Sequence, residues 1–175
     1  MKTFILTLTG SIFILTAHAQ YNKGEAAATA PAKAVYFELG GPGLASINYD
    51  MRFTNSEKGI GGRIGIGGFS VNSGSTGTTI TDRTTVIFIP LGINYLIGSD
   101  GRHYLELGGG ITPVIVNDTY SGGSDKFTST FGHLNIGYRM QPKEAGFFFR
   151  AAINPVFGKG LFWPYYGGVA FGYKF

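Results

Sequence analysis

The ionisable side chains that could do chemistry in this chain recur in one context, each placed between two apolar or small neighbours. Successive side chains of a β-strand point to opposite faces, so this context puts the charges on one face and their apolar neighbours on the other. The residues are Glu38, Asp50, Arg52, Arg63, Glu106, Arg139, Arg150 and Lys174. We predict that these three acids and five bases share an interior and pair there, because an unpaired buried charge is costly.

Such a set of inward charges allows two main uses. It can form an interlocking plug of ion pairs, or a narrow cationic path that prefers anions and is gated by those pairs. The interior of an eight-stranded barrel is about filled by side chains, which favours the plug. Glu38 and Asp50 could also act as a general acid and base, but their expected salt-bridge partners explain them sufficiently.

Other chemistries find little support in the composition. The absence of Cys excludes a disulfide framework, thiolate catalysis and Cys-based zinc sites. The formal net charge is +4, but the basic residues are scattered singly, which argues against nucleic-acid binding. Asp118 and Asp125 are too few for a calcium site. We therefore predict no metal, no cofactor and no enzymatic activity.

Eight stretches of alternating residues must position the charges, at 35–41, 44–53, 60–71, 84–97, 103–116, 127–140, 147–156 and 165–175. Short turns are expected at 55–59, 98–102 and 141–146, and longer polar loops at 72–83 and 117–126. Pro90 cannot donate a ladder hydrogen bond, so it predicts a bulge or a broken bond in the fourth strand. An even strand count, with short turns at one end and longer loops at the other, is typical of outer-membrane barrels.

The last strand, 165–175, has an apolar and aromatic face and a face of small or charged residues. Its final aromatic residues, Phe171, Tyr173 and Phe175, resemble the C-terminal signal that the barrel-assembly machinery recognises in bacterial outer-membrane β-barrels. Lys174 is expected to point inward near the periplasmic mouth. Further aromatics form two predicted belts, at the periplasmic ends (Phe53, Tyr95, Tyr138, Phe147) and at the outer ends (Phe157, Phe162, Trp163, Tyr165).

The N-terminus has a basic start, an apolar run and the small-x-small sequence Ala17-His18-Ala19. We predict a signal peptide at 1–19, a flexible periplasmic tail at 20–33 and the barrel at 34–175.

Two motifs carry a family resemblance. Tyr36-Phe-Glu-Leu-Gly-Gly41 and Asn48-Tyr-Asp-Met-Arg-Phe53 resemble the opening strands of small eight-stranded outer-membrane barrels of the OmpA and OmpX type. The resemblance implies an all-β, eight-stranded antiparallel up-and-down transmembrane barrel over residues 34–175. Some small barrels are lipid A deacylases with a His, a Ser and an acid. No Ser stands two places from His133, which we expect to be a structural histidine beside Asn135 in the lumen.

We therefore predict a bacterial outer-membrane protein, a monomer with a plugged lumen and a structural or surface-interaction role. Its expected partners are outer-membrane lipid and, during biogenesis, the barrel-assembly machinery. The alternatives are a narrow anion-preferring pore and a lipid-modifying outer-membrane enzyme. A soluble secreted β-sandwich, in which the outward residues would meet a second sheet, is the structural alternative.

Overall fold

The computed structural model describes residues 30–76, 79–99, 101–120 and 122–175, with only the backbone for 74–76 and 79–81. The predicted signal peptide and most of the predicted tail lie outside these residues. The strands are β1 Lys33–Gly40, β2 Ala45–Arg52, β3 Gly59–Thr76, β4 Thr79–Phe88, β5 Leu91–Ile97, β6 His103–Tyr120, β7 Gly123–Met140, β8 Gly146–Ile153, β9 Val156–Gly158, β10 Leu161–Trp163 and β11 Gly167–Lys174. The helical element among the described residues is one turn of 3-10 helix, η1 Gly41–Gly43. No helix in this part of the chain is long and apolar enough to cross a membrane.

The strands close into an antiparallel barrel. Neighbours in sequence pair in order, and β1 pairs with both β2 and β11, which joins the two ends of the sheet. The segments β4 and β5 share the position between β3 and β6, and β8 and β9 share the position beside β7. Counting each shared position once, and leaving out the short β10, which pairs with β9 alone, gives the eight predicted strands. The eight-stranded antiparallel barrel is confirmed.

Prolines interrupt both divided strands. Between β4 and β5, Ile89 N donates to Pro113 O at 3.0 Å and Pro90 O accepts from Gly65 N at 2.9 Å, so the ladder continues around a residue that cannot donate. The break predicted at Pro90 is thus present. A second break, at Asn154 and Pro155, divides the predicted strand 147–156, where Pro155 O accepts from Leu134 N at 2.9 Å.

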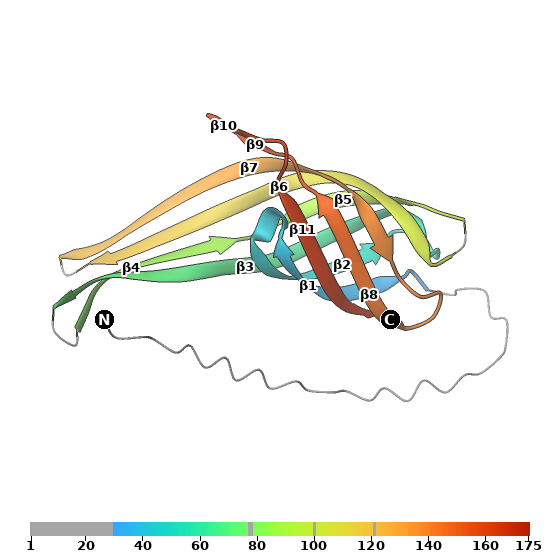
Figure 1. The fold of residues 1–175 in the computed structure, drawn as a ribbon, viewed down its shortest axis with the longest axis horizontal. Helices are drawn as coiled ribbons and strands as arrows, with labels where there is room; N and C mark the ends of the chain where they lie inside the picture. The colour runs from blue at the N-terminus through green and yellow to red at the C-terminus, as the bar shows by residue number, and fades with distance from the viewer. Residues whose placement is uncertain (1–29, 77–78, 100, 121) are drawn as a thin grey trace, which may run out of the picture.

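The predicted polar loops at 72–83 and 117–126 are wrong. Strand β3 runs on to Thr76 and β4 starts at Thr79, while β6 runs to Tyr120 and β7 starts at Gly123. The central pair, β4 and β6, stays in register from Arg83↔Thr119 to Phe88↔Val114. These segments are rich in Ser and Thr, and β-branched Thr suits a pleated strand even where both faces are polar. Figure 1 shows the two long hairpins projecting past β1, β2, β8 and β11 at one end of the barrel.

Apolar side chains cover the outside of the barrel and polar ones fill its inside. Along β1, Val35, Phe37 and Leu39 are 41%, 44% and 49% exposed. Between them, Tyr36 and Glu38 are buried. Tyr36 stacks on Phe148 with 4.8 Å between ring centroids, and these two rings with Ala34 and Ala170 form a small apolar layer in the interior. The fold therefore buries its charges and exposes its hydrophobic residues, the reverse of a water-soluble protein.

Candidate functional site: the charged interior of the barrel

All eight charged side chains singled out from the sequence lie in the interior. Arg63, at 7%, is the most exposed of them, and Lys174 is 4% exposed. The remaining six, Glu38, Asp50, Arg52, Glu106, Arg139 and Arg150, are each 2% exposed or less. The eight residues come from strands β1, β2, β3, β6, β7, β8 and β11, so residues far apart in sequence meet inside the barrel.

Asp50 joins two arginines. Its Oδ1 lies 2.8 Å from a guanidinium nitrogen of Arg52 and 2.9 Å from one of Arg139. Its other oxygen, Oδ2, accepts a hydrogen bond of 2.6 Å from the amide of Asn94. Arg52 also donates to Gly59 O at 2.8 Å, which ties the start of β3 to this group. Arg139 lies over the Phe148 ring, 4.7 Å from its centroid.

Glu106 and Glu38 continue the series of ion pairs. Glu106 lies 3.6 Å from Arg139 and 3.2 Å from Arg150, while Glu38 lies 2.7 Å from Arg150. Arg63 is the last member, 3.6 Å from the same Glu38 oxygen. The side chains alternate in charge along one connected series, which we call the lumen network: Arg52, Asp50, Arg139, Glu106, Arg150, Glu38 and Arg63.

Two amide side chains supply some of the hydrogen bonds that the charges leave open. Asn94 donates to both Asp50 and Glu106 and accepts from Arg52, and Asn135 donates to Glu106 at 3.0 Å and accepts from Arg150. Buried ions retain favourable energies only when such additional donors and acceptors are in place. The sequence predicted Asn135 in the lumen but did not single out Asn94. The signal that could have found Asn94 is its place in the alternation of the fourth predicted strand, 84–97.

Two turns, one after β2 and one after β7, meet Lys174 at the mouth of the barrel where β11 ends. Its Nζ lies 2.6 Å from Glu57 Oε1 and donates to Lys143 O, also at 2.6 Å. The Gln141 amide donates to Glu57 O at 2.8 Å and accepts from Arg139 at 2.8 Å, which connects this mouth to the lumen network. Glu57 was missed from the sequence, because a turn residue carries no alternation to fix its direction.

At the opposite mouth, the connection between β1 and β2 folds inward as η1. All three of its residues, Gly41, Pro42 and Gly43, are buried. Gly41 has φ 66°, and a Cβ at this position would stand 2.7 Å from Glu38 Cδ and Oε1. Only glycine fits both the backbone and this close approach to the carboxylate. The connection between β1 and β2 therefore packs against the Glu38 end of the lumen network.

The two histidines of the described residues are placed differently. His133 is 2% exposed and lies 3.3 Å through Nδ1 from Thr112 Oγ1, inside the barrel. His103 is exposed, stacks on Tyr138 and shares a hydrogen bond with its hydroxyl. No cluster of three or more His, Cys, Asp or Glu in the described residues is placed to hold a metal.

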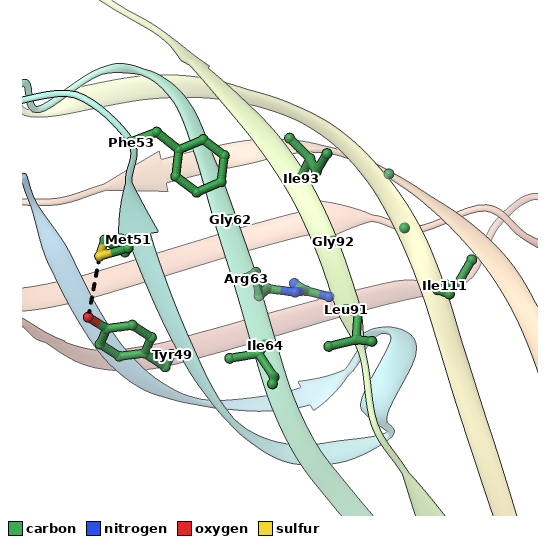
Figure 2. A pocket seen from close by; sticks show the side chains of 12 residues that line it. Tyr49, Met51, Phe53, Gly62, Arg63, Ile64, Leu91, Gly92, Ile93 and Ile111 are labelled. Carbon is green, nitrogen blue, oxygen red and sulfur yellow. Dashed lines mark hydrogen bonds between the residues drawn. The ribbon is translucent and has the colours of Figure 1, made fainter.

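The aromatic residues of the predicted C-terminal signal and belts point outward. Phe171, Tyr173 and Phe175 are 45%, 45% and 54% exposed. Outside the barrel, β2, β3, β5 and β6 also form an open groove of about 530 Å³ with Tyr49, Phe53, Ile64, Ile93 and Ile111 along it. Figure 2 shows these side chains around Gly62, whose missing side chain deepens the groove.

Solved structures share this fold at low sequence identity. The N-terminal β-barrel domain of Pseudomonas aeruginosa OprF aligns over 83% of this chain and 96% of its own, with a TM-score of 0.56 and 12% identity. The chain folds as that barrel domain does. The Yersinia pestis outer membrane protein Ail, in a phospholipid bilayer nanodisc, aligns over 83% of this chain and 97% of its own with a TM-score of 0.49 and 12% identity. No protein-family model matches the sequence, and no curated protein matches it either.

Proposed function

We propose that the protein is a monomeric integral barrel of the bacterial outer membrane, of the OmpA and OmpX type, with a closed lumen and a surface-interaction role. The observation that carries this proposal is the reversed distribution of polarity. Exposed aliphatic and aromatic side chains surround the barrel, whereas charges such as Asp50 and Arg52 are fully buried. A lipid bilayer is the environment in which such an apolar outer surface is stable. A closed sheet can lie there because its backbone hydrogen bonds are all made between its own strands.

The lumen network supports the closed state. It crosses the barrel with guanidinium and carboxylate groups in contact, and η1 and the Glu57 turn cover its two ends. An ion or solute could pass only by separating several buried ion pairs, each of which is expensive to break. The protein therefore acts as a plugged barrel.

The projecting sheet supports the surface role. The pairing of β3 with β2 ends at Gly67, so the rest of β3 has no strand on that side. In the described part of the chain, the β7 residues before Gly132 likewise have no strand on the side away from β6. These two edges carry free backbone donors and acceptors, and residues 123–130 of β7 are exposed. Such an edge is a template on which a partner can add a strand. The C-terminal residues Phe171, Tyr173 and Phe175 serve the assembly machinery, and their outward direction keeps them accessible to it.

Cysteine labelling tests both the location and the orientation. The chain has no Cys, so a single introduced thiol gives a clean signal. Asp125→Cys, on the exposed β7 segment, should react with a membrane-impermeant maleimide on intact cells. The matched variant Glu144→Cys, on an exposed turn at the other end, should react only after the outer membrane is opened. Recovery of the protein in the soluble periplasmic fraction would contradict the proposal and favour the secreted sandwich.

A further inference from the structure

The lumen network carries one more positive charge than negative. Its seven members are four arginines and three acids, and Lys174 is balanced separately by Glu57. The excess falls on Arg63. Among the described residues its one ion pair, at 3.6 Å, is with a Glu38 oxygen that Arg150 already holds at 2.7 Å. Both terminal nitrogens of Arg63 are buried and have no hydrogen-bond partner. A buried guanidinium in this state is costly unless something else binds it.

The register of the sheet leaves space beside Arg63. Arg63 is opposite Gly92, Gly92 is opposite Gly110, and Gly110 is opposite His133, so two glycines separate the arginine from the histidine along one inward row. Figure 2 shows the Arg63 side chain extending from β3 toward the Gly92 strand. A Cβ on Gly92 would lie 3.6 Å from His133 Nε2, so the histidine faces the same gap.

This gap is a small cavity of about 10 Å³ inside the barrel. A cavity of that size holds one water-sized body. Arg63 and His133 line it together with Asn94, Glu106, Asn135 and Arg150. The Glu106 carboxylate is already engaged, because its Oε1 accepts from Asn94 and Asn135 and lies 3.2 Å from Arg150. When Thr112 Oγ1 donates to His133 Nδ1, the opposite nitrogen carries a proton and can donate into the cavity.

We propose that this cavity holds one small monovalent anion of the size of chloride, bound by the Arg63 guanidinium with His133 Nε2–H as the second donor. A water molecule in the same place would satisfy a donor but leave the excess charge of the lumen network uncompensated. The anion makes the interior neutral. Because the cavity lies within the closed sheet, we expect the anion to enter as the barrel folds.

The direct test uses bromide as the probe. The protein is unfolded in urea, folded into detergent in sodium bromide and crystallised, and anomalous diffraction is recorded at the bromine edge. A single strong peak between Arg63 and His133 is expected. An ordered water with no anomalous signal, or an empty cavity, would overturn the proposal.

Two variants remove the site by different means. Arg63→Gln deletes the charge. Gly92→Ala fills the cavity but keeps the charge of Arg63, and the added Cβ would lie 3.2 Å from its nearest neighbour, Gly109 O. Arg83→Gln, at an exposed arginine on β4, is the matched control. In wild type and the control, replacing chloride by the larger gluconate at constant ionic strength during folding should make subsequent unfolding in urea severalfold faster. The two site variants should lose this difference, and an equal halide effect in all four proteins would refute the site.

Discussion

Asp50→Asn tests the lumen network where it is most densely connected. The carboxylate is fully buried, lies within 2.9 Å of both Arg52 and Arg139, and accepts a third bond from Asn94. The amide keeps the shape and removes the charge, which leaves two buried guanidinium groups without their shared partner. Breaking a buried pair from one side costs about 3–5 kcal/mol. With a urea m-value of about 2 kcal/mol/M, the unfolding midpoint should fall by about 1.5–2.5 M.

The measurement is urea unfolding of the detergent-folded protein, followed by the change in gel mobility between the folded barrel and the unfolded chain. Asp118→Asn is the matched control, since Asp118 is exposed on the projecting sheet. An exposed substitution of this kind should change stability by less than about 0.5 kcal/mol. If Asp50→Asn behaved like this control, the carboxylate would not hold the interior together.

Two further variants test the C-terminal end of the final strand. Lys174→Met removes the 2.6 Å contacts with Glu57 and Lys143 O and should destabilise the barrel by about 1.5–3 kcal/mol in the same urea assay. Lys159→Met, at an exposed lysine, should have no comparable effect, and equal losses would contradict the role of Lys174. Phe175→Ala should reduce the amount of barrel inserted in cells while the purified, refolded protein keeps wild-type stability, because Phe175 is 54% exposed. Phe162→Ala, at a residue 73% exposed in β10, should leave insertion unchanged, and a similar loss of insertion in both variants would refute a C-terminal signal.

Strict alternation explains how much of the barrel could be predicted from the sequence. Each inward charge sits between two outward apolar residues, so Glu38 or Arg150 fixes the direction of its whole strand. Pro90 predicted the break between β4 and β5, because a residue without a backbone N–H cannot donate a hydrogen bond to the neighbouring strand. Pro155 has the same property, yet the prediction carried its strand through to residue 156.

The remaining features depend on contacts that alternation does not encode. Residues 72–83 and 117–126 are polar on both faces, so no apolar pattern distinguished them from loops, although pairing between β4 and β6 makes them strands. Glu57 lies in a turn, and its contact with Lys174 depends on how two turns fold over the mouth. The cavity beside Arg63 arises because Gly92 and Gly110 fall in register with it, which only the strand pairing determines.

The measurement that bears most directly on the closed lumen is single-channel recording of the purified wild-type barrel in planar bilayers. The ion pairs from Arg52 to Arg63, closed at one end by η1 and at the other by Glu57 and Lys174, predict no steady conductance above the bare bilayer. A stable, anion-selective conductance in every inserted wild-type barrel would contradict the plug and establish a narrow pore instead.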